Sequence, residues 1–230
     1  SYIVSVQDNF LHISGSGNLT QVLDSFIVNL PTYSPNPNVL DDLCYQYHYD
    51  YRNRLIEKKI PGKDWESIVY DKLDRPVLTQ DALLKQNNEW LFTKYDALGR
   101  VVYTGKLLDI DNDRSEFQII LNTQTQLYEE HTGTSNVAGT ILNYTNQAFP
   151  IQNVIEVLTI NYYDDYTFDM AGLSIPPQNR YGHAISLNIK SLPTGSKVKV
   201  LDTNNWITTV TGYDNKARPV YIATKNEYLN

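Results

Sequence analysis

The fold is decided by a six-residue phrase, Tyr95-Asp96-Ala97-Leu98-Gly99-Arg100, which the strand-like run Val101-Val102-Tyr103 follows. Phrases of the form Tyr-Asp-x-x-[Gly/Asn/Asp]-Arg start at Tyr49 and Tyr70 as well, and a fourth, with alanine in fifth place, starts at Tyr213. The first three copies are spaced so that one strand, one turn and one returning strand fit between them. The phrase therefore predicts a row of β-hairpins.

Each residue of the phrase has a physical role in a hairpin turn. Tyr ends a strand, and the Asp carboxylate opens the turn by accepting a hydrogen bond from the backbone two residues on. The fifth residue tolerates positive φ when it is Gly, Asn or Asp, so we expect the fourth turn, with Ala217, to be a plain type I turn or distorted. Arg begins the return strand, where its guanidinium can reach the Asp carboxylate. The residues assigned to the repeat turns are Tyr49, Asp50, Asn53, Arg54, Tyr70, Asp71, Asp74, Arg75, Tyr95, Asp96, Gly99, Arg100, Tyr213, Asp214 and Arg218.

The stretches between the turns predict a meander of antiparallel strands. Residues 55–60 and 65–70 flank the turn-forming Pro61-Gly62-Lys63-Asp64, and residues 89–95 and 100–105 flank Asp96-Ala97-Leu98-Gly99. The alternation of Ile185, Leu187 and Ile189 with polar residues predicts a further strand with one wet face. Shorter strands are expected at 2–6, 10–13, 19–23, 26–30 and, after the fourth phrase, at 218–229, and a surface crossing at 31–38.

One short helix is expected, in the insertion between the third and fourth phrases. Asp113-Arg114-Ser115-Glu116 has the form of a capping box, and apolar residues follow it at helical spacing, so the helix should pack on the sheet. The run 109–116 also sets carboxylates at alternate positions, as a calcium-binding EF-hand loop does. Arg114 and Ile120 stand where such a loop needs Gly and Glu, so an acidic helix cap is favoured over a metal site.

Composition excludes several classes of protein. The chain carries 19 Lys and Arg against 26 Asp and Glu, with a pI near 5.0 and no basic run longer than Lys58-Lys59, which argues against nucleic acid as a partner. Cys44 is the single cysteine, so neither an internal disulfide nor a cysteine-based zinc site is expected. No apolar run approaches the ~20 residues that cross a bilayer, so membrane insertion is not expected. The 18 Tyr favour strands.

No residue pattern predicts catalysis. The four histidines are isolated in sequence, and His48 is interpreted as a cross-strand hydrogen-bonding residue. The acidic and aromatic run 162–169 could bind or cleave sugars, but a strand that ends in a solvated turn is the favoured interpretation. We therefore expect a protein that is not an enzyme and has no catalytic residues, no cofactor and no bound metal.

The repeated phrase, with the longer runs 49–63 and 93–105, closely resembles the Rhs or YD-repeat family, most of all the large secreted Rhs-type proteins of Bacteroidota. The resemblance is strong over 43–105, good over 151–230 and looser elsewhere. It implies a mainly β fold, a β-hairpin spiral that forms part of a hollow shell. The expected divisions are an N-terminal β segment with divergent repeats (1–42), YD-repeat hairpins (43–105), an insertion with the helix (106–150) and hairpins that end in a further repeat (151–230), all in one array that looks cut at both ends.

The resemblance also implies what such a segment does. Rhs-type shells enclose a polypeptide, and the self-cleavage core motif of toxin members is not found in this sequence, so the segment would be wall. The implied partners are the rest of its own longer chain, with further YD repeats and an enclosed C-terminal cargo, and secretion machinery. Export to the cell surface or medium by the type IX pathway is implied as well. The alternative is an extracellular adhesin that recognises glycans or proteins. Rings of Tyr45, Tyr47 and Tyr49 packed against other strands would favour the shell, and rings open to solvent would favour the adhesin.

Overall fold

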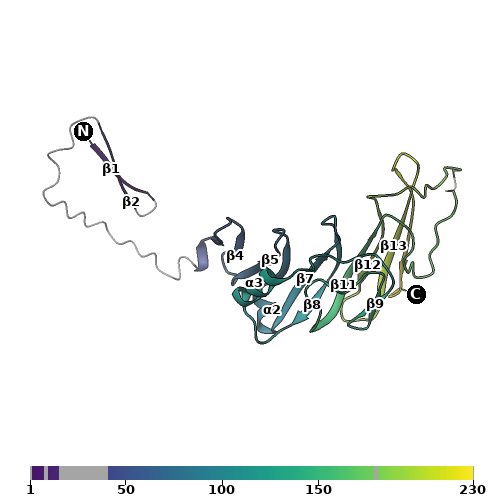
Figure 1. Cartoon of the computed structure of the whole chain (residues 1–230), viewed down its shortest axis with the longest axis horizontal. Helices are drawn as coiled ribbons and strands as arrows, with labels where there is room; N and C mark the ends of the chain where they lie inside the picture. The colour runs from purple at the N-terminus through teal and green to yellow at the C-terminus, as the bar shows by residue number, and fades with distance from the viewer. Residues whose placement is uncertain (1, 8–9, 16–40, 179–180, 230) are drawn as a thin grey trace. The chain divides into compact units, whose positions relative to one another are not determined.

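The computed structural model describes residues 2–7, 10–15, 41–178 and 181–229 (Figure 1). The chain divides into two compact units, Ser1–Asn36 and Pro37–Asn230. In the first unit, β1 (Tyr2–Gln7) and β2 (Phe10–Gly15) pair as an antiparallel hairpin. The strands expected at 19–23 and 26–30 and the crossing at 31–38 lie outside the described residues.

The second unit is built on one ten-stranded antiparallel sheet in the order β14-β13-β12-β11-β8-β7-β6-β5-β4-β3 (Figure 1). Strands that follow one another in the chain are neighbours in the sheet, except where the insertion after β8 carries the separate hairpin β9-β10. The strands are β3 (Gln46–Tyr49), β4 (Leu55–Lys59), β5 (Glu66–Tyr70), β6 (Pro76–Gln80), β7 (Glu89–Tyr95), β8 (Val101–Leu108), β9 (Ser135–Val137), β10 (Thr140–Leu142), β11 (Val154–Tyr163), β12 (Pro193–Lys199), β13 (Trp206–Tyr213) and β14 (Pro219–Asn226).

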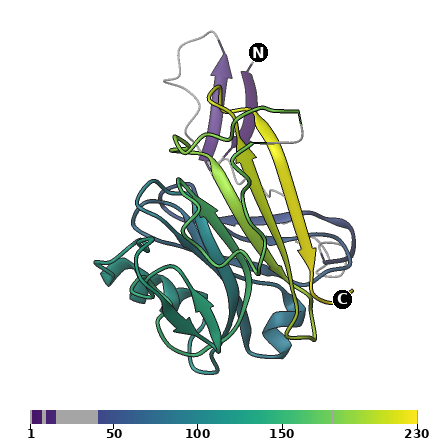
Figure 2. The same ribbon diagram turned by 90° about the vertical axis from the view of Figure 1, so that its right-hand side faces the viewer.

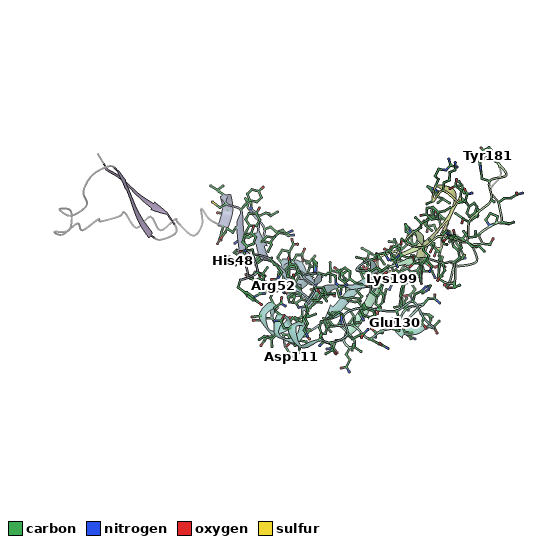
Figure 3. The ribbon with its side chains drawn as sticks, turned by 45° about the horizontal axis from the view of Figure 1, so that its top comes forward. His48, Arg52, Asp111, Glu130, Tyr181 and Lys199 are labelled. Atoms are coloured by element: carbon green, nitrogen blue, oxygen red, sulfur yellow. The ribbon has the colours of Figure 1, made fainter. Side chains whose placement is uncertain are left out.

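The expected mainly β, antiparallel fold is therefore confirmed. The sheet of the second unit is open, with β3 and β14 as its edge strands, and the described strands close into neither a barrel nor a spiral turn. Figure 3 shows that this sheet is curved across its strands, from the end that carries His48 to the end that carries Tyr181. In Figure 2 the long strands of the C-terminal half, green to yellow, run diagonally down the picture, and the insertion lies beside them at the lower left.

The described residues contain the helices α2 and α3, and residues 41–43 are helical as well, so the expectation of a single helix is wrong. Helix α3 (Arg114–Thr123) begins at the predicted capping box, in which the Asp113 carboxylate accepts from Glu116 N and the Glu116 side chain accepts from Asp113 N. The helix that the sequence pattern missed is α2 (Ala82–Gln86). It forms because the Asp81 carboxylate accepts from the backbone amides of Leu83 and Leu84, which would otherwise be unpaired at a helix start. None of the helices in the described part of the chain is long and apolar enough to span a bilayer.

The core lies between one face of the sheet and the insertion. Trp90 of β7 meets Phe117 of α3 edge to face, with 5.2 Å between ring centroids. Phe92 and Tyr103, on neighbouring strands, pack edge to face at 6.1 Å. Further along, the ring of Tyr162 stacks on Phe168 at 4.2 Å. The contact between Trp90 and Phe117 fixes α3 against the middle of the sheet, and each of these buried rings stabilises the core by removing a large apolar area from water.

The strand expected around Ile185, Leu187 and Ile189 is absent from the structure, which has irregular backbone there. The Ile185 amide donates to Pro177 O and the Ser186 amide donates to Tyr213 O, so neighbouring amides bond to two different segments. Leu187 is 83% exposed whereas Ile189 is 1% exposed. The alternation of apolar and polar residues thus anchors a loop at a few points and does not mark a strand.

Candidate functional site: the ladder of repeat turns

The four repeat phrases form turns with one hydrogen-bond pattern. In the third copy, Asp96 N donates to Arg100 O at 2.9 Å and Gly99 N donates to Asp96 O at 3.0 Å. The Asp96 carboxylate accepts from the amides of Leu98 and Arg100 through one oxygen and from Arg100 Nε, at 2.6 Å, through the other. The carboxylates that repeat this set of bonds in the other copies are Asp50, Asp71 and Asp214. Each turn is therefore closed by its own Asp and Arg.

The fifth residue of every phrase has positive φ: 59° at Asn53, 60° at Asp74, 80° at Gly99 and 60° at Ala217. The expectation that Ala217 makes the fourth turn plain or distorted is wrong, since its hydrogen bonds match those of the other three. A non-glycine residue in this region costs about 1–2 kcal/mol. The hydrogen bonds of Asp214 with Arg218 offset that cost, and they also lower the pKa of the Asp214 carboxyl to about 2.

The tyrosine that precedes each turn connects neighbouring hairpins. The Tyr70 hydroxyl donates to Leu55 O at 2.7 Å, and the Tyr95 hydroxyl donates to Pro76 O at 2.6 Å. In both pairs the acceptor is the residue directly after the arginine of the preceding turn. That arginine also lies over the tyrosine ring, with Arg75 Cζ 4.4 Å from the ring centroid of Tyr95. Burial raises the pKa of Tyr95, so the hydroxyl keeps the proton that it donates.

A fifth copy is present that the sequence template did not find. Strand β11 ends at Tyr163, directly before Asp164, and the strand pairing slips at Tyr163 as it does at Tyr95. Asp164 N donates to Leu192 O, and Ser191, with φ 68°, takes the place of Gly99. Residues 165–190 are thus inserted into one turn. Because its second half lies so far along the chain, only the Tyr-Asp pair could have signalled this copy.

The fifth copy joins the row of tyrosines without a gap. The Tyr163 hydroxyl donates to Val101 O at 3.0 Å, and the Tyr213 hydroxyl donates to Pro193 O at 2.7 Å. Arg100 lies 4.3 Å from the Tyr163 ring centroid and forms a bidentate pair with Asp164 at 3.1 and 2.5 Å. Hydrogen bonds from Arg100 hold the pKa of the Asp164 carboxyl below its usual range. We call this row of Tyr70, Tyr95, Tyr163 and Tyr213 with their acceptors the tyrosine ladder.

The ladder stops at the two edge strands of the sheet. Tyr49, at the end of β3, is 59% exposed. At the other edge, the Arg218 side chain before β14 is 62% exposed although it pairs with Asp214. Inside the sheet, the tyrosine and arginine of a repeat turn contact a neighbouring hairpin. At the two edges of the sheet, the equivalent residues are exposed to solvent.

Other residues singled out in the sequence lie elsewhere. His48 Nδ1 lies 2.8 Å from Glu57 Oε2 on the neighbouring strand, and its ring stacks on Trp65 at 4.4 Å, in agreement with a cross-strand role. In the run 162–169, Tyr162 is fully buried in the core. The rings of Tyr45 and Tyr47 are 65% and 48% exposed, so they are not packed against neighbouring strands.

The acidic run 109–116 caps α3. Asp109 accepts from the backbone amides of Asp111 and Asn112, and Asp113 is the N-cap of the helix. In Figure 3, Asp111 and Glu130 lie on the convex side of the curved sheet, the side of the insertion. No group of three or more His, Cys, Asp or Glu side chains within the described part of the chain is arranged to hold a metal ion.

Of the comparisons with known proteins, the one with solved structures gives matches. No family model matches the sequence, and no curated protein matches it. Among solved structures, the chain is similar to the crystal structure of TcdB2-TccC3-TEV, with a TM-score of 0.24 and 12% sequence identity. The similarity covers 80% of this chain, which spans 11% of the length of that chain.

Proposed function

We propose that this chain is a non-enzymatic wall segment of an Rhs-type YD-repeat shell, which encloses or presents another part of its own polypeptide. The observation that carries the proposal is the tyrosine ladder. Each of the four turns that match the repeat phrase closes on itself through Asp and Arg, while each ladder tyrosine bonds to the hairpin before it. Such a wall grows by adding hairpins, since every hairpin satisfies the edge of the preceding one and leaves a new edge.

Two further features support a wall. The sheet curves across its strands, as a wall around an interior must (Figure 3). Both edges carry exposed members of the repeat phrase, Tyr49 and Arg218, whose counterparts inside the sheet contact a neighbouring hairpin. The partners in this proposal are further YD repeats of the same polypeptide and an enclosed C-terminal cargo. Location at the cell surface or in the medium, reached through the type IX pathway of Bacteroidota, rests on the sequence resemblance alone.

Electron microscopy of the full natural gene product tests the proposal. We expect hollow particles with a β wall around internal density, and a cargo segment that resists added protease until the wall is opened by denaturant. Solid or extended particles, or a cargo that protease removes at once from the folded protein, would contradict a shell.

The edges can be tested on the 230-residue chain itself. If β3 and β14 are wall edges, the chain should self-associate with increasing concentration, and a charge on an edge strand should weaken this. Ile222→Lys changes a 65% exposed residue of β14, and Leu201→Lys changes a 63% exposed residue of the turn after β12 as a matched control. Sedimentation should show less self-association for Ile222→Lys alone. A wild-type chain that stays monomeric at every concentration would argue against open wall edges.

A second candidate function is an extracellular adhesin that binds glycans or proteins. The specific observation in its favour is the exposure of Tyr45, Tyr47 and Tyr49, three rings at one edge of the sheet. Aromatic rings open to solvent are common anchors at binding surfaces. We expect wild-type chain, and not a Tyr45→Ser, Tyr47→Ser double variant, to bind an immobilised panel of glycans and extracellular proteins. Equal signals from the two chains would remove this candidate.

A further inference from the structure

A fully buried lysine lies under the insertion. Lys94 is on the core face of β7, and its side chain is 0% exposed, as is that of Glu129. Lys94 Nζ lies 2.9 Å from Glu129 Oε1 and 2.5 Å from Asn146 Oδ1. A buried ammonium costs folding free energy unless its partners compensate, and an ion pair in the core is weak support for stability. The trio of Lys, Glu and Asn therefore needs an explanation beyond packing.

The surrounding groups hold the trio in place. Glu129 N donates to Tyr95 O at 2.8 Å, which fixes the insertion beside β7. The Glu129 carboxylate accepts from Thr145 Oγ1 and from the amides of Gln147 and Ala148. The Asn146 oxygen lies 3.3 Å from the Tyr103 hydroxyl, which can donate to it. The amine, the carboxylate and the side-chain carbonyl are thus oriented before any reaction.

We propose that Lys94 and Asn146 form an intramolecular isopeptide bond in the folded protein, with Glu129 as the proton-transfer group. The carbonyl bond of Asn146 is about 1.2 Å long, so its Cγ lies no more than about 3.7 Å from Lys94 Nζ. That limit includes the range of about 3–3.5 Å in which reacting atoms can attack.

The reaction is balanced with the groups present. Glu129 takes a proton from the Lys94 ammonium, and the neutral amine attacks Asn146 Cγ to form the new N–C bond. The Tyr103 hydroxyl donates to the oxygen as negative charge develops on it. Glu129 then returns this proton to the amide nitrogen of Asn146, and ammonia leaves as the bond between that nitrogen and Cγ breaks. The new amide nitrogen gives up its second lysine proton through the Glu129 carboxylate to the ammonia, which is released as an ammonium ion. One lysine ammonium and one asparagine amide become a secondary amide and one ammonium ion, without an oxidant or a co-reactant.

The environment favours both the attack by the Lys94 amine and the departure of the Asn146 amide nitrogen. Burial lowers the pKa of Lys94 to about 8, which makes the neutral amine accessible near physiological pH. Asn146 is half-buried, and its Nδ2 donates to Ile151 O at 3.4 Å. The leaving nitrogen therefore has a path to solvent, whereas the amine is shielded from competing water. The resulting bond would join β7 to the insertion that covers the core.

The mass of the purified chain tests this inference directly. We expect the wild-type chain to be lighter than its sequence mass by one ammonia molecule. A trypsin digest should contain the peptide 86–100, uncleaved after Lys94, joined to the peptide 115–180. The branched peptide is required because cyclisation of an asparagine elsewhere also removes ammonia. A full-mass chain that gives no branched peptide overturns the inference.

Variants assign the roles within the trio. Asn146→Ala removes the reacting carbon at a half-buried site, and the chain should then have its full mass. Glu129→Gln should also leave the chain at full mass, with folding checked by circular dichroism. Lys106→Arg, in the half-buried pair with Glu89, is the control and should still lose ammonia. A branched peptide between the same two segments in folded Glu129→Gln would exclude Glu129 from the reaction. One in Asn146→Ala would exclude Asn146.

Discussion

Removal of the Asp71 carboxylate should destabilise the sheet more than any change at the surface of the same turn. Asp71 is 2% exposed, and its carboxylate accepts from Leu73 N at 2.9 Å and Arg75 N at 3.0 Å, and from Arg75 Nε at 2.8 Å. Asp71→Ala leaves both amides and the guanidinium without this partner. Arg75 keeps its bond to Leu127 O and its place over the Tyr95 ring, so the arginine is not left entirely unpaired.

The magnitude follows from these contacts. Loss of a buried partner in a charged pair costs about 3–5 kcal/mol, and the remaining contacts of Arg75 place the expected loss at about 3 kcal/mol, the lower end. For a chain of this size that corresponds to a fall in Tm of roughly 6–12 °C. Asp71→Asn keeps an oxygen for the two amides but loses the charge, so about 1 kcal/mol is expected. Lys72→Ala, at an exposed residue of the same turn, should remain within about 0.5 kcal/mol of wild type.

Tryptophan fluorescence during thermal unfolding is the assay, at a chain concentration below that of self-association. All three tryptophans lie in the second unit, so the signal reports the sheet that contains the turn. Lys72→Ala should have the highest Tm of the three variants, Asp71→Asn an intermediate Tm and Asp71→Ala the lowest. If Asp71→Ala melts with Lys72→Ala, the carboxylate does not hold the turn and the role assigned to the repeated Asp is wrong.

Three further predictions concern the tyrosine ladder and the repeat turns. Tyr95→Phe removes the hydroxyl that bonds to Pro76 O and should cost about 1 kcal/mol, measured by urea unfolding; a loss no larger than that of Tyr51→Phe, whose ring is 91% exposed, would contradict the ladder. Ala217→Gly should stabilise the chain by up to about 1 kcal/mol because φ is 60° there, whereas Gly99→Ala, at φ 80°, should destabilise it, and equal melting temperatures would refute the argument. Because Arg100 lowers the pKa of Asp164, their pairing stabilises the fold above the ordinary pKa of 3.8 and is lost as pH falls through the lower folded value; Asp164→Asn should flatten the decline in Tm below about pH 5, and an unchanged decline would exclude this pair as its source.

The parts of the fold that the sequence predicts are those set by local contacts. The hydrogen bonds of the Asp96 carboxylate reach only to Leu98 and Arg100, so a short phrase contains all that its turn requires. The same holds for the cap of α3, where Asp113 and Glu116 bond to each other's backbone. These elements could be placed from residue types and spacing alone.

The parts that the sequence does not predict depend on contacts between distant residues. The turn at Asp164 closes on Leu192, and Lys94 meets Glu129 and Asn146 only once the insertion has folded onto β7. The alternation at 185–189 was misread because periodicity alone does not distinguish a strand from a loop anchored at alternate residues. Without neighbouring segments in view, the exposure of Tyr47 at the edge of the sheet could not be foreseen either.

The interrupted turn at Asp164 has a consequence for how such arrays can diversify. The hydrogen bonds that align β11 with β12 survive although 26 residues separate the two halves of the corner. A turn that accommodates so long an inserted loop allows new surface loops to be added to the array while the strands on either side keep their pairing partners. Variety in these loops and constancy in the strands can therefore evolve separately.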